Sequence, residues 1–244
     1  MREKIFNTYV SNLSMEETVS KVEEIIETKV PTQHVVINAS KINLMNKDKS
    51  LTEIVNSCPI INADGASILW AAKKMDIDLK ERVTGIDLFE ELLKLANKKK
   101  LRIYLFGAKE DVVVVVKQNI EKQYPNITIS GYRNGYFSEE DEVGIVSDIK
   151  QSNSDMLFVA FSSPKKEFWI NKYLSDLNVP FCMGVGGSFD VMAGMTKRAP
   201  EWMQKNGLEW FYRFIQEPTR LFKRYIVGNV KFVILTYKYK FNKK

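Results

Sequence analysis

The stretch MGVGGSFDVMAGMTKRAPEWMQKNGLEWFYRFIQEPTRLFKRY, residues Met183–Tyr225, carries the features that decide the fold. It begins inside an apolar run, Val179–Val185, which predicts a buried strand. Gly184, Gly186 and Gly187 lie at the end of that run, and glycine lets the backbone turn tightly and approach a ligand closely. Beyond them, Trp and Tyr alternate with Arg and Lys. A bare backbone beside a cationic, aromatic segment suits a ligand with a phosphorylated head and an apolar anchor, at a membrane surface.

Composition places the chain among ordinary globular proteins. Its 244 residues, 45% hydrophobic and 27% charged, can form one large domain or one domain with an added lobe. We expect no transmembrane helix, because no run of about 18 uncharged apolar residues occurs, and the N-terminus lacks the apolar stretch of a signal peptide. Cys58 and Cys182 lie in apolar runs, which favours reduced core thiols in the cytoplasm. His34 is the only histidine, so neither a His-cluster zinc site nor a Ser-His-Asp triad is expected.

The positive charge is concentrated in the last fifth of the chain. Residues 197–244 contain twelve Lys or Arg and three Glu, a net charge of +9, whereas the remaining residues carry −3. The same segment holds eleven aromatic residues. This asymmetry predicts a polyanionic partner, either anionic lipid headgroups or nucleic acid.

Apolar strand patterns and amphipathic helix patterns alternate along residues 1–196. Strands are expected at His34–Asn38, Ile60–Asn62, Leu101–Phe106, Ile127–Gly131, Met156–Phe161 and Val179–Val185. Helices are expected from a capping box at Ser14 and Glu17 through Glu27, around Lys41–Lys47, and at Ala66–Lys74, Ile86–Lys98, Glu110–Gln123, Glu139–Lys150 and Lys165–Leu174. The alternation predicts an α/β fold in which helices cover both faces of a mostly parallel sheet. Residues 197–244 form a separate C-terminal appendage of helices, broken by Pro218 and at Gly228.

One helix assignment opposes local propensity. Glu110–Gln123 contains five consecutive valines, Val112–Val116, which prefer strand geometry. The helix is nevertheless the better interpretation of its place in the alternation.

Polar residues just after each strand are the candidate site residues, because ligands of such sheets bind beyond the carboxyl ends of the strands. Asp64 follows one strand and precedes Gly65 and a helix. It fits a helix N-cap. It fits equally well a general base that accepts a proton from a substrate hydroxyl. Position alone leaves both interpretations open.

Glycines after two other strands suggest phosphate binding. Gly107 and the Gly186-Gly187 pair could each form a simple turn. Neither gives GxGxxG, and no GxxxxGK[ST] occurs, which argues against a dinucleotide site or a P-loop. Backbone amides at helix starts still allow a single nucleotide diphosphate to bind without a set motif.

The Asp-Ile-Asp sequence at Asp76–Asp78 has the form that holds a metal in many nucleotide-sugar transferases. It follows a helix and is flanked by lysines, which favours a surface loop. Without a metal, Arg82, Lys165 or Lys166 would offset the charge of a leaving diphosphate. Lys165 and Lys166 begin an expected helix, where cations oppose the helix dipole. This conflict indicates a functional role, with a solvated first turn as the alternative.

The appendage carries three arginines in helical spacing. Arg213, Arg220 and Arg224 are separated so that one helical face could hold all three. The apolar residues around them are numerous enough to leave apolar surface exposed, a combination typical of interfacial helices. We favour a membrane surface over a solvated basic face, and nucleic acid is the weaker alternative.

These segments together resemble the WecG/TagA/CpsF family of bacterial glycosyltransferases, and the similarity spans nearly the whole chain in the family's order. The matching blocks are NADGASILW (Asn62–Trp70), ERVTGIDLFEELL (Glu81–Leu93), GYF (Gly135–Phe137), PKKEFWI (Pro164–Ile170), GVGGSFDVMAG (Gly184–Gly194), RAPEW (Arg198–Trp202) and GLEWFYRFIQEPTRLFKRY (Gly207–Tyr225).

The resemblance implies a Rossmann-like core, an appendage that reaches the membrane, and no metal or other cofactor. It implies transfer of a sugar, typically of the N-acetylmannosamine type, from a UDP donor to lipid-diphosphate-linked GlcNAc. Asp64 maps to the proposed base, and Arg213, Arg220 and Arg224 map to arginines proposed to hold the acceptor diphosphate. The donor site is implied at Asn38, Arg82, Gly107, Tyr136, Lys166, Glu167, Gly186, Gly187 and Asp190.

Two departures from the family pattern face the donor. The family often has Thr-x-Asn after the first strand, and here Val36 precedes Asn38. The usual Gly-x-Pro-Lys-Gln-Glu is Ser162–Glu167, with Ser162 for Gly and Lys166 for Gln. A mannosaminyl donor therefore does not follow from the resemblance alone, and another UDP-hexose is the alternative.

The sequence as a whole predicts an inverting, metal-independent glycosyltransferase of cell-surface polysaccharide synthesis, for teichoic acid or capsule. Its partners would be a UDP-sugar, a polyprenyl-diphosphate-linked acceptor and the anionic inner face of the cell membrane, where the protein would be peripheral and cytoplasmic. Nucleic acid is not expected. The exposed apolar tail could instead pair two copies of the chain. Two other classes stay open, a nucleic-acid-binding module and a nicotinamide-dependent oxidoreductase.

Overall fold

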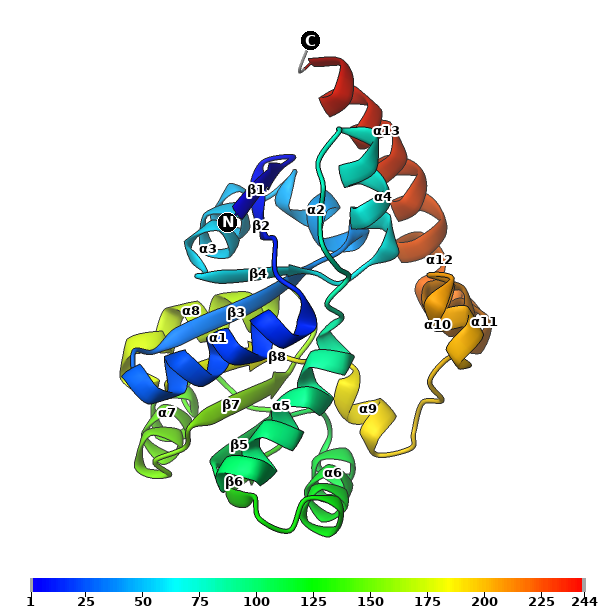
Figure 1. The fold of residues 1–244 in the computed structure, drawn as a ribbon. Coiled ribbons are helices and arrows are strands. Elements are labelled where there is room, and N and C mark those ends of the chain that lie inside the picture. The colour runs from blue at the N-terminus through cyan, green and yellow to red at the C-terminus, as the bar shows by residue number, and fades with distance from the viewer. Residues whose placement is uncertain (1, 243–244) are drawn as a thin grey trace.

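The computed structural model describes residues 2–242, with only the backbone of Asn242. Its centre is a six-stranded sheet of order β4-β3-β8-β7-β5-β6, in which every pairing is parallel (Figure 1). The strands are β3 (Thr32–Ile37), β4 (Ile60–Ala63), β5 (Arg102–Gly107), β6 (Thr128–Arg133), β7 (Met156–Ala160) and β8 (Phe181–Gly184). The predicted parallel α/β sheet is confirmed.

Helices cover both faces of this sheet, as predicted. Strand side chains alternate between the faces: in β8, Phe181 and Met183 join one core cluster and Cys182 joins another. The first face is covered by α1 (Met15–Thr28), α5 (Gly85–Lys99), α6 (Glu110–Gln123) and the short α9 (Ser188–Met192). The second is covered by α7 (Glu142–Gln151) and α8 (Lys165–Leu177), with α2 (Ala39–Met45), α3 (Lys49–Ser57) and α4 (Ala66–Lys74) beside β3 and β4.

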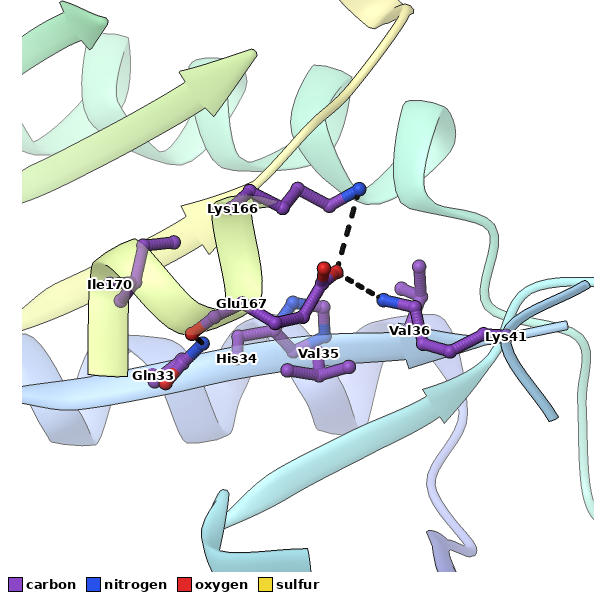
Figure 2. A pocket seen from close by; sticks show the side chains of 9 residues that line it. Gln33, His34, Val35, Val36, Lys41, Lys166, Glu167 and Ile170 are labelled. Carbon is purple, nitrogen blue, oxygen red and sulfur yellow. Dashed lines mark hydrogen bonds and ion pairs between the residues drawn. The ribbon is translucent and has the colours of Figure 1, made fainter. Parts of the chain in front are cut away.

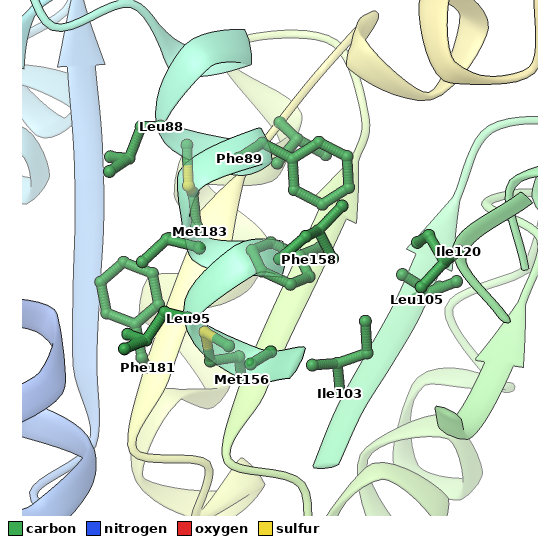
Figure 3. Packing of buried hydrophobic residues seen from close by; sticks show 14 of the residues in the cluster. Leu88, Phe89, Leu95, Ile103, Leu105, Ile120, Met156, Phe158, Phe181 and Met183 are labelled. Atoms are coloured by element: carbon green, nitrogen blue, oxygen red, sulfur yellow. The ribbon is translucent and has the colours of Figure 1, made fainter. Parts of the chain in front are cut away.

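The first face holds a core of aromatic and long aliphatic side chains (Figure 3). Phe89 of α5 meets Phe158 of β7 edge to face, with ring centroids 4.7 Å apart, and Met183 of β8 lies nearby. Phe89 and Phe158 are fully buried. This contact packs α5 onto the middle of the sheet and so helps to position the first turn of α5 relative to the strands.

The valine-rich segment is helical over Glu110–Gln123, as expected. Val112, Val113 and Val116 are buried against the first face, and Glu110 and Asp111 lie in the first turn, where acidic side chains favour the helix dipole. Burial of three β-branched side chains thus outweighs their modest preference for strand geometry.

The sequence did not predict the strands β1 and β2 or the helices α3 and α9. Residues near the N-terminus form an antiparallel hairpin of β1 (Arg2–Ile5) and β2 (Thr8–Ser11), separate from the main sheet. Helix α3 begins at its N-cap Asp48, whose side chain accepts a hydrogen bond from the Leu51 amide. Hairpin and helix pack together because Ile5 and Val10 share a core cluster with Leu51.

The C-terminal segment leaves the core and returns to it. It runs through α10 (Glu201–Lys205), α11 (Glu209–Gln216), α12 (Pro218–Phe222), a π-helical turn (Lys223–Val227) and α13 (Gly228–Asn242). Pro218 opens α12, so the predicted break there is confirmed. The break expected at Gly228 is wrong, because Gly228 has helical φ and ψ of −66° and −43° and joins the π-helical turn to α13.

Helix α13 packs against α2 and α4 (Figure 1). Phe232 is 1% exposed and its ring centroid lies 5.3 Å from that of Phe6 in the hairpin. The last helix of the appendage therefore shares a hydrophobic cluster with the core.

Candidate active site

The carboxyl ends of β3 and β4 bring Asn38 and Asp64 together. Asp64 is partly buried, and its Oδ2 accepts a hydrogen bond of 3.1 Å from the Asn38 amide. Its Oδ1 accepts a hydrogen bond of 2.9 Å from the backbone N–H of Gly85, the first residue of α5. Two donors thus hold the carboxylate in one orientation.

The N-cap interpretation of Asp64 is wrong for the helix that follows it. The N-cap of α4 is Gly65, which offers no side chain to that helix. Asp64 instead bonds to the start of a different helix, α5. Asn38 is itself a cap, since its Oδ1 accepts the Lys41 amide at 3.1 Å and its amide group is thereby turned toward Asp64.

A buried charge cluster lies beside this pair, between α2 and α8 (Figure 2). The carboxylate of Glu167 is 1% exposed and its Oε1 accepts hydrogen bonds from Lys41 Nζ and, at 3.0 Å, from Ser163 Oγ. Lys166 Nζ lies 3.5 Å from the same Oε1 and donates to Ser163 Oγ at 2.9 Å. Two ammonium groups therefore share one carboxylate, and the cluster carries a surplus positive charge.

Burial and charge shift the ionisation of this cluster. Burial, reinforced by the charge of Lys41, lowers the pKa of Lys166 to about 8, although Glu167 opposes the shift. Burial alone would raise the pKa of Glu167, but Lys41 and Lys166 outweigh it and hold that pKa below its usual value. Glu167 is therefore an anion at neutral pH. Lys166 titrates just above neutral pH, because its pKa is about 8.

The glycine of β8 makes room for Lys166. A Cβ atom at Gly184 would lie 2.5 Å from Lys166 Cδ, and one at Gly186 would lie 3.6 Å from its Nζ. The Lys166 side chain thus crosses the end of β8 and ends beside Gly186, at the carboxyl edge. Lys165, by contrast, is exposed, and its Nζ lies 4.3 Å from the ring centroid of Phe137. The solvated alternative holds for Lys165 and fails for Lys166.

The three appendage arginines line one hollow with the end of β8. Arg213, Arg220 and Arg224 line a hollow that is open to solvent. The same hollow is lined by Gly187, Asp190, Thr196, Gln216, Glu217, Leu221 and Tyr225. Predicted donor and acceptor residues therefore meet here.

The sequence predicted that the three arginines could share one helical face, and the structure shows that they do not. Arg213 lies on α11, Arg220 on α12 and Arg224 on the π-helical turn, and the chain bends between the first two at Glu217.

Burial raises the pKa of Asp190 above its usual value, although Arg220 and Arg213 oppose the shift. Arg220 is paired with Glu217, its Nε 2.6 Å from Oε2. The hollow thus gathers cations around a carboxylate that holds its proton more firmly than usual.

Three remaining site residues lie apart from this hollow. Gly107 ends β5 with φ +119°, and a Cβ there would lie 2.9 Å from the Ala160 nitrogen. Tyr136 is 70% exposed beyond β6. Arg82 ion-pairs with Glu209 at 3.2 Å and donates to the Gln204 carbonyl at the same distance. Their predicted contacts with the donor stay predictions.

Lys41 is the site residue that sequence reasoning missed. It is 3% exposed and lies in the first turn of α2, directly after β3. The signal was present, because a cation near a helix start at a strand end is the same conflict that singled out Lys166. Asp76 and Asp78 are exposed, in agreement with a surface loop.

A model of the glycosyl transferase WecG/TagA/CpsF family matches residues 3–244. The chain belongs to this family. It is therefore a glycosyltransferase, which decides among the three classes that the sequence left open and confirms the resemblance.

Two curated relatives carry the same name, N-acetylglucosaminyldiphosphoundecaprenol N-acetyl-beta-D-mannosaminyltransferase. The relative from Bacillus subtilis (strain 168) is 40% identical over 198 residues, which are 81% of this chain and 76% of the relative. The relative from Staphylococcus aureus (strain MW2) is 34% identical over 187 residues, 77% of this chain and 73% of the relative.

Within residues 2–242, no helix has the length and apolar character needed to span a bilayer. Over the same residues, no three His, Cys, Asp or Glu side chains gather in a way that could hold a metal ion. Cys58 and Cys182 are buried and unpaired with each other, as expected for core thiols.

Proposed function

We propose that this chain transfers N-acetylmannosamine from UDP to GlcNAc linked to polyprenyl diphosphate, in the synthesis of teichoic acid or capsule. The names of the relatives support the substrates. The anchored carboxylate of Asp64 at the strand ends is the observation that carries the chemistry.

The reaction is a single displacement with inversion. Asp64 accepts the proton of the acceptor hydroxyl, whose oxygen bonds to the anomeric carbon while the bond from that carbon to the UDP oxygen breaks. UDP leaves as an anion from the opposite face of the sugar. Hydrogen bonds from Asn38 and Gly85 aim the carboxylate but leave lone pairs free for the incoming proton.

Cationic side chains stabilise the departing diphosphate in this proposal, with no metal ion required. Lys166 reaches Gly186 at the end of β8. The surplus positive charge of the buried cluster is available to an anionic ligand because Glu167 is already shared with Lys41. Arg213, Arg220 and Arg224, which line the adjacent hollow, hold the acceptor diphosphate.

We propose that the enzyme is a peripheral protein on the inner face of the membrane, where it would meet its lipid-linked acceptor. Large apolar side chains stay exposed along the C-terminal segment, among them Phe211, Ile215, Phe222, Ile226, Val230, Ile234 and Phe241. Apolar surface beside arginines suits an anionic bilayer interface.

The test is turnover of Asp64→Asn with UDP-N-acetylmannosamine and a short-chain lipid-diphosphate GlcNAc. The amide keeps the shape but accepts no proton, so turnover falls about 10²–10⁴-fold. Asp78→Asn, an exposed site, is the matched control. Near-normal turnover in Asp64→Asn refutes the base, and loss of turnover with EDTA refutes the metal-free mechanism.

A second donor remains the alternative because of the departures from the family pattern at Val36 and Lys166. Both residues line one pocket with Lys41 and Glu167, which we propose belongs to the donor site. A panel of UDP-hexoses on the same acceptor decides between them: faster turnover with another UDP-sugar than with UDP-N-acetylmannosamine replaces the proposed donor.

A further inference from the structure

The RAPEW motif contains an arginine that none of the steps above uses. Arg198 lies between α9 and α10 and is 24% exposed. Its Nη2 ion-pairs with Asp87, its Nη1 lies 3.4 Å from Glu90 and its Nε lies 4.0 Å from Glu209. Three carboxylates from α5 and α11 thus surround one guanidinium at the start of the C-terminal segment.

Asp87 uses each of its oxygens for a different partner. Its Oδ1 takes Arg198, and its Oδ2 accepts the Thr84 hydroxyl at 2.6 Å. Thr84 is the N-cap of α5, 2% exposed, and its Oγ1 in turn accepts the Asp87 amide at 3.1 Å. Arg198 therefore binds the carboxylate of Asp87, which is hydrogen-bonded to the N-cap of α5.

That turn also supplies one of the two hydrogen bonds to Asp64. The residue after Thr84 is Gly85, whose N–H donates to Asp64 Oδ1 at 2.9 Å. An unbroken chain of contacts thus runs from Arg198 through Asp87, Thr84 and Gly85 to the carboxylate. On the other side of the turn, Arg82 is held by Glu209 and the Gln204 carbonyl of the C-terminal segment.

We propose that Arg198 is a positioning residue, which transmits the placement of the C-terminal segment to Asp64 through the first turn of α5. The inference rests on the proposed role of Asp64 as the base. When the segment is docked, Asp87 and Thr84 hold the Gly85 N–H toward the carboxylate. When it is not, that donor is free to move. The base is thereby fully oriented only while the arginines of the same segment are in place.

The experiment compares Arg198→Gln and Arg198→Lys with Lys205→Gln. Lys205 lies on α10, is 80% exposed and forms an ion pair of 3.9 Å with Glu201, which is 87% exposed, so its variant removes a charge from the same segment without touching the network. A water-soluble acceptor keeps membrane binding out of the assay. We expect Arg198→Gln to lower kcat about tenfold or more, with the KM for the UDP-sugar little changed, because orientation rather than binding is lost.

Rescue by the conservative variant separates positioning from simple docking. Arg198→Lys retains one ion pair and recovers part of kcat.

Two outcomes overturn the proposal. One is a kcat in Arg198→Gln that matches that of Lys205→Gln. The other is a change confined to the KM of the acceptor, which leaves Arg198 a docking residue only. If Arg198→Gln does not fold, Thr84→Val decides, because it breaks the chain of contacts while leaving Arg198 paired. An unchanged kcat in Thr84→Val also refutes the proposal.

A measurement independent of turnover keeps this inference distinct from the proposed base. The amide resonance of Gly85 in an NMR spectrum reports its hydrogen bond to Asp64. We expect it to move in Arg198→Gln and Thr84→Val and to stay in place in Lys205→Gln. Asp64→Asn with normal turnover would remove the base, whereas an unmoved Gly85 resonance would remove the coupling.

Discussion

Replacing Lys166 with methionine should stabilise the protein at neutral pH. Burial lowers the pKa of Lys166 from 10.5 to about 8, so the folded state holds this proton less tightly than the unfolded state does. At 1.36 kcal/mol per pKa unit, the charged ammonium opposes folding by about 3 kcal/mol below pH 8. Its side chain is 12% exposed, so solvent screens little of this effect. Methionine keeps the long apolar stem and removes the charge.

The sign of the pH dependence follows from linkage. Between pH 8 and 10.5 the unfolded lysine keeps its proton and the folded one has lost it, so the free energy of unfolding of the wild type rises with pH. The advantage of Lys166→Met is therefore largest below pH 8 and vanishes near pH 10.5.

Urea denaturation at pH 7 and near pH 10 measures both quantities, and Lys165→Met is the matched control because Lys165 is exposed one position earlier. The control should change stability by less than about 1 kcal/mol. A Lys166→Met protein that is less stable than wild type at pH 7, or whose difference from wild type does not depend on pH, refutes the reasoning.

Two further predictions concern the same cluster and the C-terminal segment. Glu167→Gln leaves the buried Lys41 without its carboxylate and should lower the free energy of unfolding by about 3–5 kcal/mol in the same assay, and a loss below about 1 kcal/mol contradicts the buried pair. The double variant Ile215→Glu and Ile234→Glu should bind anionic phospholipid vesicles at least about tenfold more weakly, because each exposed aliphatic side chain stabilises the bound state by about 1.5–3 kcal/mol when it is buried. Val143→Glu on α7 is the control for vesicle sedimentation, and unchanged binding with an altered oligomeric state would assign the apolar face to a second copy of the chain.

The sequence specified the sheet well because its strands are buried on both faces and read as apolar runs. Because the ends of the strands could be predicted, so could the polar residues beyond them, and Asn38, Asp64 and Asp190 were named from position. Lys41 has the local signal of a cation at a helix start, but its burial depends on Glu167, which lies more than a hundred residues away in the chain. Local sequence does not identify that partner.

The C-terminal segment shows where periodicity reaches its limit. Spacing correctly predicted that Arg213, Arg220 and Arg224 lie together, but it predicted one helical face instead of separate helical elements. The bend at Glu217 has no clear sequence signal beyond the proline that follows it. The docking of Phe232 against Phe6 was likewise unreadable, since it joins the two ends of the chain. The Arg198 network needed three separate blocks of sequence to meet in space.

The return of α13 to the core gives the arginines a high effective concentration at their hollow. The stretch that carries them is tied down at both ends, by Arg198 on one side and by Phe232 on the other. A segment with one loose end would lose more conformational entropy each time it closed over an anion. Here most of that ordering is completed during folding, and we propose that an anion bound in the hollow relieves the mutual repulsion of the guanidinium groups that line it.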